Sequence, residues 1–196
     1  VTRGFGQSQP TIDLDVQPRG DASSLRTSIQ PVAFPYRMEI HSGAMHYRDG
    51  HIDFKDLQAQ HRSTSIRTSG GCELIAGQGW HLQLNNLSVQ QARLQGEDPE
   101  LLAALPKPLK RAIGELRPTG PVNLKGKLDF AKRSPAEAVR IGWNVELFLN
   151  RASVQLGPRL ENVFGSVQFI GSSDGARYAS HGQLKLDSLT YKNLQF

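Results

Sequence analysis

Cysteine is nearly absent from this chain, since Cys72 is the one cysteine among 196 residues. A single cysteine excludes an intrachain disulfide, and with it the small disulfide-stapled folds. The composition fits a reducing compartment and equally an envelope protein that does not rely on disulfides. Cys72 follows Gly70–Gly71 without a local signature of a base or an oxyanion donor. We therefore interpret it as a small residue at the start of a strand and not as a nucleophile.

Long apolar runs are also lacking. No stretch approaches the ~18 residues that a membrane-spanning helix needs, and the residues that follow Val1 do not form a signal-peptide pattern. The chain ends on GQLKLDSLTYKNLQF, Gly182–Phe196, which alternates, turns at Asp187–Ser188 and alternates again without a closing turn. We therefore expect a slice of a longer β-structure that continues past Phe196, with any anchor or export signal outside the slice.

Signals for nucleotide or nucleic-acid binding are sparse. Aromatic residues make up 7% of the chain and are not interleaved with basic ones, so no stacking platform for a single strand is predicted. The net charge of +5 is scattered, with 18 acidic residues among the basic ones, which favours a mildly basic surface over a nucleic-acid site. Gly4-Phe5-Gly6 and Gly77-Gln78-Gly79 lack the third glycine of a dinucleotide fingerprint. We predict no nucleic acid partner and no cofactor.

Candidate metal ligands and catalytic residues do not converge. Three of the six histidines, His41, His46 and His51, follow one another at intervals of five. An odd interval places successive side chains on opposite faces of a strand, so we expect exposed histidines and no metal site. Asp13 and Asp15 fall on the polar face of an alternating strand, where solvated carboxylates are expected. No catalytic residue is predicted, and the chain is interpreted as non-enzymatic.

Alternation of apolar and polar residues runs through most of the chain. The stretch TIDLDVQP, residues 11–18, has the period of two that is typical of a half-buried strand. Asp49–Gly50 lies between two alternating runs and predicts a two-residue hairpin. After it, Ile52 and Phe54 share a face, whereas Leu57 is displaced by one residue, which indicates a β-bulge.

Further runs of this kind predict roughly a dozen short strands, with turns at Gly70–Gly71, Gly77–Gly79, Asn85–Asn86 and Ser172–Gly175. Such spacing is typical of an all-β fold, and the short connections favour antiparallel neighbours. A sheet with one apolar face must cover that face. A sandwich, a barrel and a bent sheet filled by another molecule all meet this requirement.

The stretch DPELLAALPKPLKRAIGELRPTG, residues 98–120, has a different pattern. Asp98 is a predicted N-cap with Pro99 at the first helical position. Pro106 interrupts the helix, and Pro118 with Gly120 ends it, so a broken helix is predicted near 99–117. Apolar residues recur at helical spacing in both halves: Leu101, Leu102, Leu105, Leu109, Ala112, Ile113 and Leu116.

The helical stripe has two interpretations. It can pack on the sheet or contact a membrane surface, and packing is favoured because each half is only about two or three turns long. The chain is thus divided into a β segment over 1–97, a helical insert over 98–120 and a β segment over 121–196.

Three stretches resemble the AsmA-like family, which includes TamB-like proteins. IHSGAMHYRDGHIDFKDLQAQ is similar to its repeating unit of glycine, strand, Asp-Gly and strand. LLAALPKPLKRAIGELRPTGPVNLKGKLDF is similar to its recurring insert of a leucine-rich helix followed by a strand. LENVFGSVQFIGSSDGARYASHGQLKLDSLTYKNLQF is similar to another repeating unit, and the whole is most like very large planctomycete-type members.

The resemblance implies an elongated, strongly curved antiparallel sheet, a taco-like β-groove with an apolar interior. It implies a non-enzymatic envelope segment that carries phospholipid between membranes or serves outer-envelope assembly. Its partners would be phospholipid acyl chains and neighbouring segments of the same longer chain. It would be periplasmic and anchored in the inner membrane outside this segment. The groove positions expected from one-sided alternation are Val122, Leu124, Leu128, Phe130, Val145, Leu147, Val167, Phe169, Leu184 and Leu186.

Two other functions remain open on the residues alone. A structural or adhesive β-sandwich would pack its apolar faces against each other and leave no continuous trough. A carbohydrate-active β-enzyme would need carboxylates converging in a cleft, whereas the acidic residues here are dispersed on polar faces.

Overall fold

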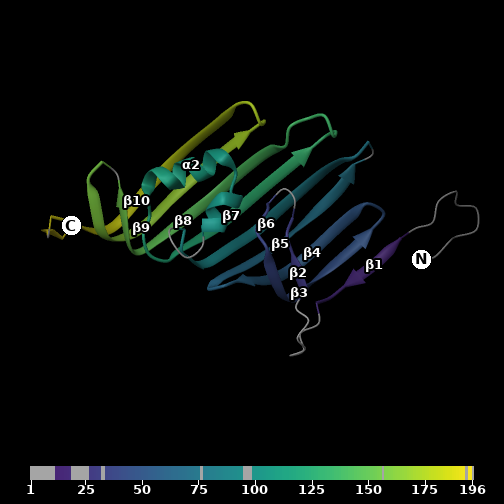
Figure 1. The fold of residues 1–196 in the computed structure, drawn as a ribbon, viewed down its shortest axis with the longest axis horizontal. Helices are drawn as coiled ribbons and strands as arrows, with labels where there is room; N and C mark the ends of the chain where they lie inside the picture. Colours follow the sequence, from purple (N-terminus) through teal and green to yellow (C-terminus); the bar gives the residue numbers. More distant parts are fainter. Residues whose placement is uncertain are drawn as a thin grey trace, which may run out of the picture.

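The computed structural model describes residues 12–18, 27–31, 34–75, 77–94, 99–155, 157–192 and 194–195. These residues form eleven strands and two helices, and all of the strands belong to one open, curved, antiparallel sheet (Figure 1). Strands account for 69% of the residues and helices for 8%, so the predicted all-β fold with a short helical segment is confirmed. The predicted features at Gly4–Gly6, Asp98 and Phe196 lie outside the described residues.

Strand neighbours in the sheet follow chain order almost throughout. From β3 to β11 each strand pairs with the next, while β1 and β2 pair with opposite ends of β3. Most of the strands are longer than the sequence predicts. Their bounds are β1 Asp13–Val16, β2 Thr27–Ile29, β3 Met38–Arg48, β4 His51–His61, β5 Thr64–Ile75, β6 Gly79–Ala92, β7 Val122–Lys132, β8 Arg140–Gln155, β9 Arg159–Ser173, β10 Tyr178–Tyr191 and β11 Leu194–Gln195.

The predicted hairpin at Asp49–Gly50 is confirmed. Arg48 of β3 pairs with His51 of β4, so the loop contains two residues. Asp49 has φ 44° and Gly50 has φ 89°. Positive φ at both central positions is the requirement of a type I′ turn, whose twist matches that of the flanking strands.

Three other predicted turns are wrong, because Gly70–Gly71, Asn85–Asn86 and Asp187–Ser188 each lie inside a strand. At Gly70 a side chain would collide with the backbone carbonyl of Gln83, so the glycine serves the close approach of two strands. At the other two sites the cross-strand register shifts, as in a β-bulge. A bulge restores the apolar face after an extra residue, which the sequence pattern alone does not distinguish from a turn.

Four residues inside strands adopt the left-handed backbone conformation, each beside a register shift: Asp56 (φ 47°), Gln91 (φ 59°), Arg151 (φ 53°) and Asn162 (φ 49°). The bulge at Asp56 confirms the predicted displacement of Leu57. Such bulges bend a strand and increase its twist. The curvature of the sheet therefore follows from the local backbone geometry at these bulges.

Two of the bulges have a backbone donor that is paired with a side chain. The backbone N–H of Asp56 donates to Oγ of Ser69 at 3.0 Å, and that of Gln91 donates to Oδ1 of Asn123 at 3.0 Å. In both cases a side chain of the neighbouring strand replaces a lost ladder bond, so the bend does not leave these donors unsatisfied.

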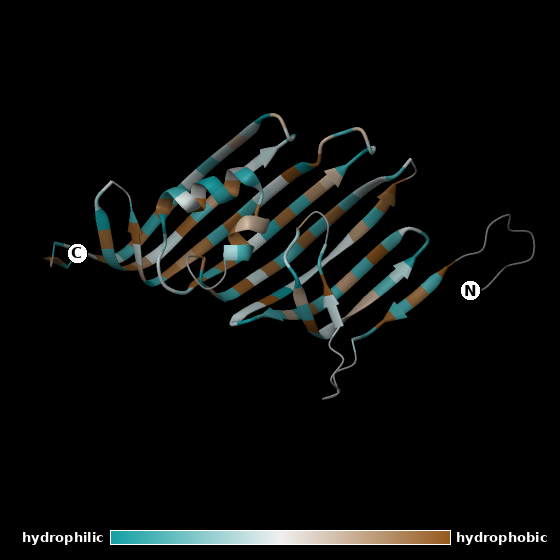
Figure 2. Cartoon of the chain, viewed as in Figure 1, coloured by the Kyte–Doolittle hydropathy of each residue, from teal (hydrophilic) through white to brown (hydrophobic). Residues whose placement is uncertain are grey.

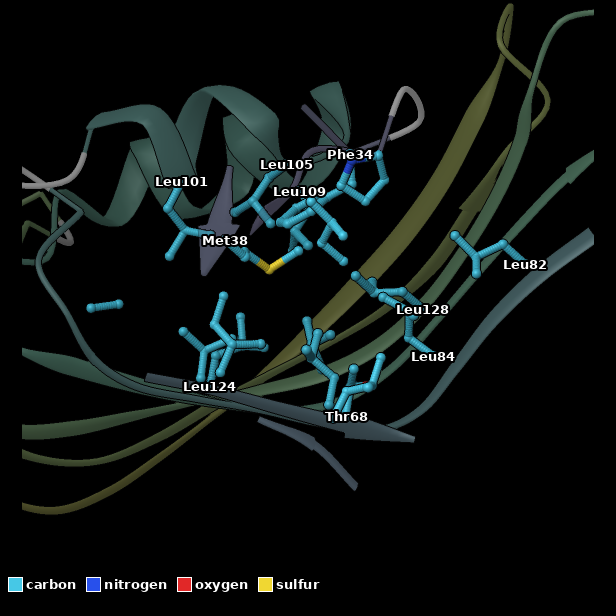
Figure 3. Close-up of a pocket in the computed structure, with 18 of the residues that line it drawn as sticks. Phe34, Met38, Thr68, Leu82, Leu84, Leu101, Leu105, Leu109, Leu124 and Leu128 are labelled. Atoms are coloured by element: carbon cyan, nitrogen blue, oxygen red, sulfur yellow. The ribbon is translucent and has the colours of Figure 1, made fainter. Parts of the chain in front are cut away.

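The helical insert forms α1, Pro99–Ala104, and α2, Lys107–Leu116. Pro106 separates the two helices, and Arg117, with φ 43°, ends α2 before Pro118, as predicted. Both helices lie against the inner face of the curved sheet (Figures 1 and 3). Packing on the sheet is therefore the confirmed interpretation of the apolar stripe, whose buried members are Leu101, Leu105, Leu109, Ile113 and Leu116. The side chain of Ala112 is outside what the structure describes.

Candidate binding groove

The inner face of the sheet carries a continuous apolar row. Cross-strand partners in the row run from β3 to β10, one residue from each strand. The row is Ile40, Ala59, Ile66, Val89, Leu124, Leu147, Val167 and Leu184. Because directly paired residues point to the same face, the row lies on one side of the sheet. Colouring by hydropathy shows alternating apolar and polar bands along the strands (Figure 2).

A cavity of about 320 Å³ lies between the helices and this face. Leu101, Leu105 and Leu109 point from the helical side toward Leu84 and Leu124 of the sheet (Figure 3). The accessible wall of the cavity is apolar throughout. Such a space can bind hydrocarbon by burial.

The predicted groove positions fall into three sets. Five of them line the cavity: Val122, Leu124, Leu128, Val145 and Leu147. Three others are buried outside its wall: Phe130, Val167 and Phe169. The last two, on β10, leave 38% and 39% of their surface exposed: Leu184 and Leu186. The apolar face thus passes from a part roofed by the helices to a part open to solvent.

Much of the cavity wall was not among the predicted positions. The N-terminal half of the chain supplies Met45, Ile52, Phe54, Leu57 and Ile66 from β3, β4 and β5. These residues carry the same alternation as the predicted ones, so the signal was present in the sequence. The part contributed by Pro31 and Phe34 has no periodic signal, because these residues lie outside the strands.

Cys72 lies in the wall of the cavity together with Thr68. It occupies an interior position of β5, opposite Ile52 and Leu82, and not the start of a strand as expected. Partial burial raises the pKa of the Cys72 thiol above its ordinary value, because the apolar surroundings disfavour the thiolate. The cavity therefore contains a thiol of low reactivity at neutral pH.

Histidines form pairs with carboxylates across strands, most of them at exposed positions. Nδ1 of His46 is 2.9 Å from Oδ1 of Asp15, and Nε2 of His81 is 2.8 Å from Oδ2 of Asp129. Asp13, the other half of the Asp-x-Asp pair, also lies within 3.5 Å of His46. In the part of the chain that the structure describes, no group of three or more His, Cys, Asp or Glu side chains is arranged to hold a metal ion.

None of the described helices combines the length and apolar character required to cross a membrane. Comparison with known proteins gives no match, whether with family models, with curated proteins or with solved structures.

Proposed function

We propose that the inner face of this sheet binds the acyl chains of phospholipids. In this proposal the chain is a non-enzymatic segment of an AsmA-like protein of the bacterial envelope, which moves phospholipid between membranes or serves outer-envelope assembly. The observation that carries the proposal is the apolar row from Ile40 to Leu184, together with the cavity of about 320 Å³ above it.

The energetics of burial favour such a guest. Each methylene group that leaves water for an apolar surrounding contributes about 0.8 kcal/mol. A chain of ten buried methylene groups would therefore gain on the order of 8 kcal/mol before the cost of ordering it. The exposed apolar residues of β10, Leu184 and Leu186, would be covered by the same kind of guest.

The alternative of a β-sandwich has less support. In the described residues the strands form one sheet, so no second sheet covers the apolar row. A carbohydrate-active enzyme has less support as well, because the accessible wall of the cavity is apolar throughout.

The proposal includes partners and a location. Neighbouring segments of the same longer chain would pair with the edge strands β1 and β11, where the backbone has no partner strand on one side within the described residues. The segment would lie in the periplasm and be held at the inner membrane by an anchor outside it.

The proposal is tested by native mass spectrometry of the 196-residue chain purified from a bacterial host. Native mass spectrometry is expected to find bound phospholipid, and Leu84→Trp is expected to lower its amount because the indole fills part of the cavity that Leu84 lines. Gln83→Trp is the matched control, since Gln83 is the preceding residue on the same strand and is exposed. Lipid-free protein, or equal loss in both variants, would contradict the proposal.

A further inference from the structure

A buried tryptophan of β8 has a hydrogen-bond donor that pairs with nothing in the described part of the chain. Trp143 is only 4% exposed, and the described residues place no acceptor within hydrogen-bond distance of its indole Nε1. Folded proteins seldom bury an N–H group without an acceptor, because the group has lost its hydrogen bond to water. An acceptor supplied from outside the chain would therefore be bound favourably at this point.

Trp143 lies between two spaces on the inner face of the sheet. Its cross-strand partner on β7 is Leu128, which lines the apolar cavity. On the other side the indole lies over Gly171 of β9, where the missing side chain leaves room for the ring. The partner of Gly171 on β10 is Ser180, which lines a second hollow of about 370 Å³. Because directly paired residues point to the same face, this row leads from the cavity past the indole to the hollow.

The two spaces differ in chemistry. The accessible wall of the cavity is apolar throughout, whereas the hollow is lined by polar and apolar groups. Phe169 is an apolar part of the hollow, and Tyr178 and Ser180 bring hydroxyl groups to it. The helical insert adds Arg111 and Glu115, which form an ion pair with each other. The order along the row is thus an apolar space, a buried N–H donor and a polar hollow.

We infer that Nε1 of Trp143 donates a hydrogen bond to the ester carbonyl of an acyl lipid whose hydrocarbon chain occupies the cavity. The polar end of this lipid then lies in the hollow beside Ser180. An acyl ester has its groups in the same order as the row: hydrocarbon, carbonyl acceptor and polar end. The indole N–H can only donate, so it favours an acceptor such as a carbonyl oxygen. This inference rests on the proposed function, because it requires an acyl chain in the cavity.

The position of α2 indicates how the guest reaches the buried donor. The helix packs on β8, the strand of Trp143 (Figure 1). Leu109 and Ile113 of the same helix line the cavity. An acyl chain that enters beneath α2 would push the helix away from β8 and uncover Nε1 as the carbonyl arrives.

The experiment compares an ester with the matching ether. Isothermal titration calorimetry of the 196-residue chain with decanoylglycerol and decylglycerol, each below the concentration at which it aggregates, gives two dissociation constants. These amphiphiles share the glycerol group and the length of the hydrocarbon chain, and only the ester has a carbonyl. The ester is expected to bind about tenfold more tightly, as one hydrogen bond to a buried donor allows. Trp143→Phe keeps an aromatic ring without the donor and should bring the two constants within about twofold of each other.

The control variant is Trp80→Phe, which changes the other tryptophan of the chain. Trp80 lies on β6 and belongs to the wall of neither space. This variant should keep the preference for the ester. Thermal unfolding of each variant checks its fold.

A second measurement uses the native side chain and so decides the result should Trp143→Phe not fold. The chain has two indole N–H resonances in a proton–nitrogen NMR spectrum, and the spectrum of Trp80→Phe identifies the one that belongs to Trp143. A hydrogen bond to a carbonyl moves this proton downfield. Decanoylglycerol should therefore shift it further downfield than decylglycerol does, and equal shifts would overturn the inference.

The possible failures are distinguishable. If neither amphiphile binds, both the proposed function and this inference are wrong. If the ester and the ether bind equally well to the native chain, the cavity accepts a hydrocarbon chain but Trp143 does not bind a carbonyl. A preference for the ester that persists in Trp143→Phe would place the carbonyl at another donor and would also overturn the inference.

Discussion

The indole of Trp143 lies over Gly171 of the neighbouring strand. A Cβ added to Gly171 would be 2.5 Å from Cζ2 of Trp143 and 2.5 Å from the backbone oxygen of Ala179. We expect Gly171→Ala to lower the free energy of unfolding by about 2 kcal/mol, because neither the ring nor the paired backbone can give way cheaply. Urea denaturation followed by tryptophan fluorescence measures the change.

Gly142→Ala is the matched control for this prediction. Gly142 lies beside Trp143 in β8, and an added Cβ there would meet only Cβ of Asp129 at 3.6 Å, an ordinary contact. Equal losses of stability in the two variants would mean that the contact with Trp143 is not the cause.

A second prediction concerns the bulge at Arg151, whose φ of 53° disfavours any residue with a Cβ. Arg151→Gly should raise the free energy of unfolding by roughly 0.5–1 kcal/mol relative to Arg151→Ala. Comparing the two variants removes the effect of losing the side chain, which is exposed. A glycine variant no more stable than the alanine variant would show that this bend imposes no strain.

Cys72 provides a direct reporter of the cavity, since it is the one cysteine of the chain. Burial raises the pKa of its thiol above the ordinary value of 9.0, so alkylation by N-ethylmaleimide should be slow at pH 7 and accelerate as the pH rises past 9. Dodecyl maltoside should slow it further by occupying the space that Cys72 lines. The rate is read from intact mass, and an unchanged rate with bound amphiphile would place the hydrocarbon elsewhere.

The turn between β9 and β10 gives a pH-dependent prediction. Backbone hydrogen bonds from Arg177 and Ala176 lower the pKa of Asp174 below its ordinary value of 3.8. Its Oδ1 accepts the N–H of Arg177 at 2.7 Å and that of Ala176 at 3.0 Å. A depressed pKa means that the charged form stabilises the fold above the unfolded-state pKa, and this stability is lost as the pH falls through the folded-state pKa.

Asp174→Asn removes the charge and keeps an acceptor oxygen at this turn. We therefore expect this variant to be less stable than the native chain at pH 7, and the difference to shrink and vanish as the pH falls through the lowered folded-state pKa of Asp174. Thermal unfolding at several pH values measures it. A difference that persists at low pH would assign the effect to packing and not to the carboxylate.

The residues of the apolar face could largely be predicted from the sequence, whereas the positions of the bulges and of the strand ends could not. Leu124 and Leu147 alternate so regularly that their shared face follows from the period of two. At Asn85–Asn86 the same pattern fits a turn or a bulge, and only pairing with β5 and β7 decides between them. Local sequence therefore indicates which side chains face inward, and partner strands determine where each strand ends.

The contact between His61 and Glu100 could not be predicted from the sequence, for a different reason. His61 and Glu100 are 39 residues apart, and their contact depends on how the helical insert lies on the sheet. The sequence predicts the insert and its apolar stripe, because those are local properties. It does not predict the direction in which the insert crosses the strands, which is fixed by packing against residues far away in the chain.

The left-handed residues at Asp56, Gln91, Arg151 and Asn162 have a mechanical consequence. Their bends are built into hydrogen-bonded strands, so the shape of the trough does not depend on its contents. A sheet of this kind stays bent when no molecule is bound to its inner face. In the proposed function, successive acyl chains would therefore move along the inner face without the strands refolding at each step.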